Sequence, residues 1–165
     1  MHIKRITKHL LLPQWQVNRA FPIDTLAAID RAIKASEAAH AGEVRFAVEG
    51  ALDGAPLLKG QSARERAIEV FSQLRIWDTE HNNGVLIYLL LADRDVEIVA
   101  DRGIHAKVGS REWEQICRKM KTDFKQSNYE DGVVSGIQEV TQHLIKHFPA
   151  SGAGQNELPD KPVVL

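Results

Sequence analysis

Two short polar segments carry the side chains best suited to chemistry in this 165-residue sequence. They are residues 78–83, which read Asp-Thr-Glu-His-Asn-Asn, and residues 101–103, which read Asp-Arg-Gly. Carboxylate and amide oxygens are the donors that Ca²⁺ takes in relaxed geometry and that Mg²⁺ takes alongside water. A guanidinium beside them can hold a phosphate or carboxylate through two parallel hydrogen bonds. The metal ligands predicted here are Asp78, Glu80, Asn83 and Asp101, and the predicted anion ligand is Arg102.

The strands around these segments determine whether they meet. Residues 43–49 alternate between apolar and polar, which is typical of a half-buried strand, and 84–91 form a continuous apolar run, which indicates a strand buried on both faces. After a polar turn at 92–95, residues 96–100 are expected to return antiparallel. The first polar segment precedes the central strand and the second follows its antiparallel neighbour. We therefore expect both at one edge of the sheet.

Helical periodicity supplies the rest of the fold. Apolar residues recur every three or four positions in 22–39 and in two stripes, 113–124 and 133–148. A helix over 62–77 is predicted to begin at Ser62, because Glu65 three residues later completes a capping box. The predicted fold class is α/β: a three-layer α/β/α sandwich on a small mixed sheet, with helices on both faces and the first two strands parallel.

Three regions are expected along the chain: a basic N-terminal arm at 1–21, one domain at 22–148 whose first helix covers 22–40, and a flexible tail at 149–165. The arm contains Lys4, Arg5, Lys8 and Arg19 and no acid. It either contacts a membrane surface or a partner, or packs Leu11 and Trp15 on its own domain. With no secretory signal and no membrane-spanning run, a cytoplasmic location is expected, peripheral at the inner membrane face if the arm binds lipid.

Several function classes are disfavoured by composition and motifs. A net charge of −1 argues against a dedicated nucleic-acid binder, and the lone Cys117 excludes an internal disulfide framework. No Walker loop, dinucleotide fingerprint or Gly-x-Ser-x-Gly elbow is present. His143 and His147 share a helix face but lack the glutamate placement of a zinc protease.

The polar edge also has structural interpretations. Asp and Asn are common in turns, and Arg102 can pair with Asp78 as a clamp. The opposite edge of the sheet, where Asp53 and the turn at 93–95 lie, is a second candidate, because ligands of α/β sheets usually bind at the carboxyl ends of parallel strands. We rank it below the first, since the turn is readily explained as a solvated hairpin.

Four stretches give the chain a resemblance to the TPM domain over about residues 40–148. This family includes thylakoid-lumen proteins of photosystem II repair, a worm receptor accessory protein and many bacterial membrane-associated proteins. Residues 77–80 and 147–149 resemble a bacterial subgroup with one short TPM domain. The stretches that carry the resemblance are 82–87, Asp93–Arg94, 96–100 before Gly103, and 129–133.

The resemblance implies an α/β/α sandwich, a divalent-cation site and, for some plant members, acid phosphatase activity. Asp78, Asn83, Asp101 and Arg102 align with the family's polar edge. Many relatives carry a cleaved signal and a transmembrane segment, neither of which is seen here. Many also have an aromatic residue where this chain has Arg102. The arginine adds a positive charge to the edge, which favours the binding of anions.

Three functional hypotheses follow. The first is an accessory or scaffold module for an unidentified protein partner, with Ca²⁺ or Mg²⁺ at the Asp78, Glu80 and Asp101 edge. The second is a metal-dependent phosphatase in which Arg102 stabilises the transferring group and His81 or His105 donates a proton. The third is a metal-free interaction domain whose residues 1–21 contact lipid or a neighbour. No nucleophile–base pair is recognisable, which favours a binding module over an enzyme.

Overall fold

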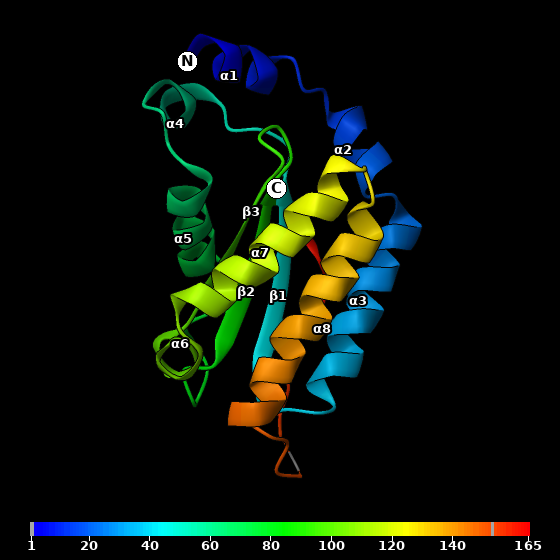
Figure 1. The fold of residues 1–165 in the computed structure, drawn as a ribbon, viewed down its shortest axis with the longest axis vertical. Helices are drawn as coiled ribbons and strands as arrows, with labels where there is room; N and C mark the ends of the chain where they lie inside the picture. Colours follow the sequence, from blue (N-terminus) through cyan, green and yellow to red (C-terminus); the bar gives the residue numbers. More distant parts are fainter. Residues whose placement is uncertain (1, 153) are drawn as a thin grey trace.

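A four-stranded mixed sheet lies at the centre of the computed structural model, which describes residues 2–152 and 154–165 (Figure 1). The strand order is β3-β2-β1-β4. β1 is parallel to both β2 and β4, and β2 is antiparallel to β3, so the pairing predicted for the first three strands is confirmed. The strands are β1 (Glu43–Glu49), β2 (Gly84–Leu90), β3 (Asp95–Ala100) and β4 (Val163–Val164).

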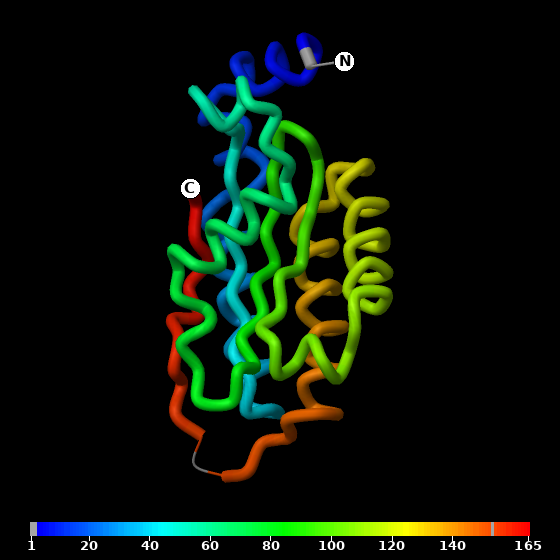
Figure 2. Tube along the Cα trace, turned by 90° about the vertical axis from the view of Figure 1, so that its left-hand side faces the viewer, coloured from blue at the N-terminus to red at the C-terminus, as the bar shows by residue number. Residues whose placement is uncertain are grey.

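Helices cover both faces of this sheet, which confirms the predicted three-layer sandwich. Figure 2 shows α7 and α8 in yellow and orange on one side of the strands, and α5 with the red C-terminal segment on the other. α3 packs beside α8 on the first side. The helices are α1 (His2–Leu10), α2 (Gln14–Ala20), α3 (Ile23–Glu37), α4 (Gly54–Leu58), α5 (Ala63–Gln73), α6 (Arg102–Val108), α7 (Ser110–Lys125) and α8 (Tyr129–His147).

The central strand β2 divides its side chains between two cores. Val85, Ile87 and Leu89 join the core under α3, α7 and α8, whereas Leu86 and Tyr88 join the core under α5. All seven residues of β2 are buried. The continuous apolar run in the sequence therefore reflects a strand covered on both faces, as predicted.

The final part of the C-terminal tail, which the sequence predicted to be flexible, lies against the sheet in this structure. The backbone N–H groups of Glu157 and Leu158 donate to the two carboxylate oxygens of Glu43, at 2.9 and 3.2 Å. The guanidinium of Arg45 donates to the carbonyl of Pro159. These contacts bury the polar side of β1, which the alternating sequence predicted to be exposed.

The N-terminal arm forms α1 and α2, and it packs on its own domain. Its buried side chains include His9 and Val17, which are 3% and 1% exposed. Leu11 and Trp15, which one of the two alternatives placed against the domain, are 72% and 56% exposed. None of the helices described is long and apolar enough to cross a membrane.

Local chemistry explains where α5 begins and ends. α5 begins at the predicted capping box: Glu65 N–H donates to Ser62 Oγ at 3.2 Å, and Ser62 N–H donates to Glu65 Oε2 at 2.8 Å. The helix ends at Gln73 rather than at the predicted Trp77, because Arg75 adopts a left-handed conformation with φ of 54°. α4 occupies part of the predicted loop 50–61, and α6 was not predicted.

Removing this cap gives the first testable expectation. Ser62→Ala deletes the acceptor for the Glu65 N–H, and N-cap losses of this kind lower the free energy of unfolding by about 1 kcal/mol. Urea unfolding of the variant measures the difference. Ser62→Asn is the control, because Asn caps helices as well as Ser. An alanine variant as stable as the wild type would show that the capping bonds contribute nothing.

Candidate functional site: the N-terminal edge of the central strand

The two polar segments lie side by side at one edge of the sheet, as the topology predicted. The N–H of Asp101, at the end of β3, donates to the carbonyl of Gly84 at 2.9 Å. The N–H of Ile104, in α6, donates to the carbonyl of Asn82 at 3.2 Å. The loop before β2 and the start of α6 are thus tied together through the backbone.

Gly103 permits this close approach. A Cβ atom at this position would lie 2.6 Å from the carbonyl oxygens of both His81 and Asn82, closer than any side chain can sit. Asn82 itself adopts a left-handed conformation, with φ of 51°. Two backbone carbonyl oxygens are therefore turned towards the first turn of α6.

Asp101 caps the first turn of α6 with one carboxylate oxygen, and its other carboxylate oxygen has no hydrogen-bond partner among the described residues. Its Oδ1 accepts a hydrogen bond from the N–H of Arg102 at 2.7 Å. Its Oδ2 is buried and accepts no hydrogen bond from the described residues. A buried oxygen without a donor is costly, which makes Oδ2 the most suitable point on this edge for a cation.

Asn83 is fully buried, but the register directs it away from Asp101. Its Nδ2 donates to the carbonyl of Ala41 at 3.0 Å, and its Oδ1 accepts no hydrogen bond within the described chain. Gly84 lies opposite Asp101, and neighbouring residues of a strand point to opposite faces. The side chains of Asn83 and Asp101 therefore point to opposite faces of the sheet.

The other two predicted ligands extend into solvent. Asp78 pairs with Arg75 at 2.8 Å, with both side chains more than half exposed, so the alternative of an Arg102–Asp78 clamp is wrong. The side chain of Glu80 is 78% exposed. Arg102 is also exposed. Among the side chains that the structure describes, at residues 3–152 and 154–165, no three of His, Cys, Asp or Glu are grouped so that they could hold a metal.

The two histidines considered as proton donors lie apart. His81 is exposed, with its Nε2 3.9 Å from Glu80 Oε2. His105 instead lines a groove of about 470 Å³ with Arg64 and Glu97, against β3. Cys117 borders the same groove but is buried, and burial raises the pKa of its thiol to about 12, so it stays protonated.

Sequence reasoning missed a group of acids around the tail at this end of the sheet. Besides the Glu43 carboxylate described above, Glu157 contributes an oxygen that accepts from the backbone N–H of Glu80 at 2.9 Å. Glu37, at the end of α3, accepts from Val44 N–H at 3.1 Å, and burial raises its pKa to about 9, with further raising by Asp160. These acids escaped detection because the tail that covers them was expected to be flexible.

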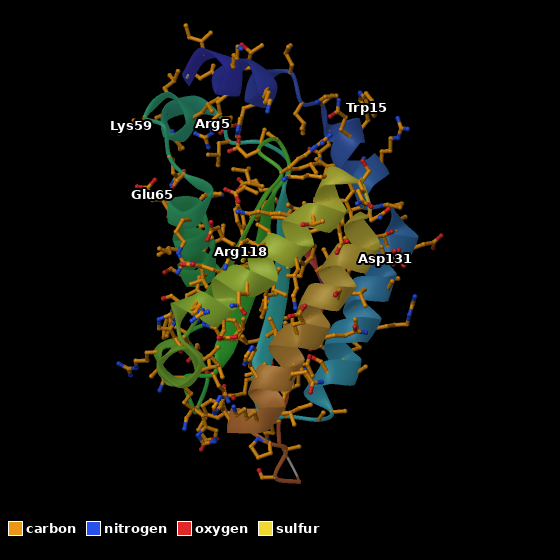
Figure 3. The ribbon with its side chains drawn as sticks, viewed as in Figure 1. Arg5, Trp15, Lys59, Glu65, Arg118 and Asp131 are labelled. Carbon is orange, nitrogen blue, oxygen red and sulfur yellow. The ribbon has the colours of Figure 1, made fainter. Side chains whose placement is uncertain are left out.

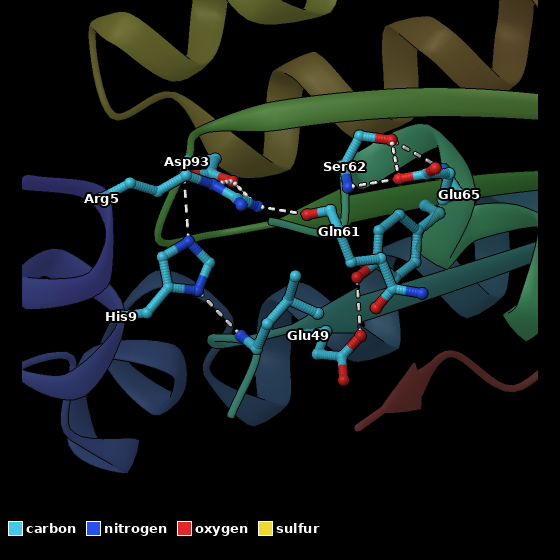
Figure 4. A network of polar contacts seen from close by, with 9 residues as sticks. Arg5, His9, Glu49, Gln61, Ser62, Glu65 and Asp93 are labelled. Carbon is cyan, nitrogen blue, oxygen red and sulfur yellow. Dashed lines mark hydrogen bonds and ion pairs between the residues drawn. The ribbon is translucent and has the colours of Figure 1, made fainter. Parts of the chain in front are cut away.

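The opposite edge of the sheet is organised around Asp93, in the turn between β2 and β3 (Figure 4). Arg5 and His9, both from α1, bind its carboxylate at 2.8 and 3.0 Å. Burial opposes the ionisation of Asp93, but these two bonds outweigh it and lower the pKa of Asp93 below its usual range. The turn is therefore an attachment point for the arm and not the solvated hairpin that the sequence suggested.

Comparisons with known proteins agree with this fold. The family model of the TPM domain matches residues 19–143. Protein BA42 of the psychrophilic bacterium Bizionia argentinensis is 30% identical over 86% of this chain and 93% of its own, with a TM-score of 0.76. The N-terminal domain of a P. gingivalis protein is 20% identical over 72% of this chain and 74% of its own, with a TM-score of 0.57, and shares the fold. No curated protein matches the chain.

The chain belongs to the TPM-domain family. The family match covers α3, the first three strands and most of α8, so it includes both segments of the polar edge. α1 begins before the matched region and β4 lies after it.

Proposed function

We propose that this TPM domain is a binding module that takes up a divalent cation, Ca²⁺ or Mg²⁺, at the edge formed by residues 78–83 and 101–103. The observation that carries the proposal is the buried Oδ2 of Asp101, which accepts no hydrogen bond from the described residues. The carbonyls of His81 and Asn82 face the turn that Asp101 caps. Together they offer one charged and two neutral hard oxygens.

The proposed ligand set is smaller than the one the sequence suggested. Asp78 is paired with Arg75, and Asn83 faces the other side of the sheet. Glu80 is exposed in the same loop and is free to approach a cation bound at Asp101. With so few protein donors, water must complete the coordination shell, so binding in the range of about 10⁻⁴–10⁻³ M is expected.

The test is a titration of metal-stripped, ¹⁵N-labelled protein with Ca²⁺ and then Mg²⁺, followed by NMR. Saturable amide shifts are expected at residues 81–82 and 101–104. Asp101→Asn should abolish them while the helix stays capped, because Asn is as good an N-cap as Asp. Asp78→Asn is the matched control: it removes a carboxylate from the same loop and should leave the shifts unchanged.

Two results would count against the proposal. Titration of the wild type without shifts at 101–104 excludes a cation at this edge. Equal shifts in the wild type and in Asp101→Asn place any bound cation elsewhere. Loss of the shifts in Asp78→Asn as well would instead support the larger ligand set predicted from the sequence.

A further inference from the structure

α1 has two faces with different tasks. Arg5 and His9 are four residues apart and point towards Asp93, with Ile6 beside them partly buried in the domain. The opposite face carries Ile3 and Leu10, seven residues apart, which are 79% and 70% exposed. Because its inner face is bonded to Asp93, α1 is held with Ile3 and Leu10 facing the solvent.

The attachment is specific and does not depend on the apolar outer residues. The N–H of Leu52 donates to His9 Nδ1 at 2.9 Å, so the imidazole proton lies on Nε2, which donates to Asp93 at 3.0 Å. Arg5 adds bonds to Asp93 and to the carbonyl of Gln61, at 2.9 and 2.8 Å. Figure 4 shows these bonds converging between α1 and the turn after β2.

Two cations lie on another side of the exposed surface of α1. Lys4 and Lys8 are exposed and four residues apart, so they share one side of the helix. No acid occurs in the first 21 residues. The exposed surface of α1 therefore has an apolar side and a basic side, as do amphipathic helices that lie in a membrane interface.

Neighbouring elements extend this face. α4 contacts α1 and exposes Leu58, which is 73% accessible, beside the exposed Lys59. α2 contributes Trp15 and the exposed Arg19. Figure 3 shows Trp15 and Lys59 at the same end of the molecule as α1. Five of the ten large apolar side chains exposed in the described chain lie on these three helices or, for Leu11, in the linker between α1 and α2: Ile3, Leu10, Leu11, Trp15 and Leu58.

We infer that the end of the molecule formed by α1, α2 and α4 docks on an anionic lipid bilayer surface. Lysines and arginines at the rim would bind phosphate headgroups, while the aliphatic side chains and the indole of Trp15 enter the interface. The surface suits a bilayer better than a peptide, because its apolar residues are spread over three helices. The groove beside them, of about 860 Å³, has polar side chains such as Lys8, Gln16 and Arg19 in its lining.

This docking is independent of the cation proposed above, because the two surfaces lie at opposite ends of β2. The cation edge precedes the strand, and Asp93, which holds α1, follows it. Failure of one proposal therefore leaves the other intact.

Co-sedimentation of the full chain with vesicles tests the inference. Vesicles of phosphatidylcholine mixed with phosphatidylglycerol are expected to pellet the protein, and vesicles of phosphatidylcholine alone should pellet several-fold less. Added salt should weaken the binding, because it screens the lysines. Two pairs of variants locate the surface: Trp15→Ser against Trp77→Ser, and Lys8→Glu against Lys146→Glu.

Each pair contains one exposed residue at each end of the molecule. Trp15→Ser and Lys8→Glu are expected to reduce binding at least fivefold, while Trp77→Ser and Lys146→Glu should bind like the wild type. The inference is overturned if the protein stays in the supernatant with anionic vesicles. It is also overturned if both members of each pair lose binding equally, because the attraction would then be nonspecific.

Discussion

Gly84→Ala is expected to lower the free energy of unfolding by about 3 kcal/mol, the upper part of the range for overpacked cores. A Cβ atom at Gly84 would lie 2.2 Å from the carbonyl oxygen of Ile76 and 2.8 Å from Ile76 Cγ2. The first contact is with backbone, so no change of rotamer relieves it. The segment between α5 and β2 must move away from the start of the central strand.

Thermal unfolding measures this effect. For a domain of this size, a loss of about 3 kcal/mol corresponds to a drop in Tm of roughly 10 °C. Gly154→Ala is the control, since a Cβ atom there has no neighbour within 4 Å, and it should unfold at the wild-type temperature. Equal melting temperatures for both variants would mean that the turn before β2 is loosely packed.

The clash at Gly84 belongs to a part of the fold that the sequence predicted only in outline. The strand was evident, because seven apolar residues in succession require cover on both faces. The close approach of Ile76 was not, because a glycine before a strand is equally consistent with a simple turn. The pattern of apolar residues in a sequence predicts which residues are buried, but it does not predict which atoms they contact.

The same distinction applies at the candidate site. The convergence of 78–83 and 101–103 follows from strand order and direction alone, and it was predictable. The orientation of the side chains was not: Asp78 finds Arg75 three residues away, and Asn83 turns to Ala41 across the edge. Local partners and the register of a strand end decide these orientations, and neither is visible in a list of residue types.

The ends of the chain were the least predictable. A composition rich in Gly, Ser and Pro indicates disorder only where no partner compensates the loss of entropy. Here, Glu43 and Arg45 on β1 provide that partner, by bonding the backbone of residues 157–159. The sequence predicted that the polar residues of β1 face solvent. Glu43 and Arg45 instead face a segment more than a hundred residues later in the chain.

The second large effect is a dependence of the stability of the protein on pH. The stability of this protein is expected to fall as the pH rises through the range between about 4.5 and 9, owing to Glu37. Burial, and to a smaller extent the nearby Asp160 and Glu43, raise the pKa of Glu37 from 4.5 to about 9. Within this range the folded state holds a proton that the unfolded state has lost, so each pH step favours unfolding.

Glu37→Gln should remove this dependence. The amide has the shape of the protonated acid, its oxygen can still accept from Val44 N–H, and its nitrogen can donate to Asp160. The slope for one proton is at most about 1.4 kcal/mol per pH unit, and the partial exposure of Glu37 reduces it. Urea unfolding at pH 5 and pH 8.5 should therefore find the variant close to the wild type at pH 5 and more stable by about 2 kcal/mol at pH 8.5.

His40 must be separated from this effect, because it acts with the opposite sign. Its burial lowers its pKa from 6.5 to about 4, so the unfolded state binds the extra proton and stability falls as the pH drops between those values. The wild type and Glu37→Gln both retain His40, and the difference between them isolates Glu37. Glu114→Gln, at an exposed carboxylate of α7, is the control and should keep the wild-type dependence. Parallel curves for the wild type and Glu37→Gln would mean that Glu37 is ionised in the folded protein and that Arg45 neutralises it.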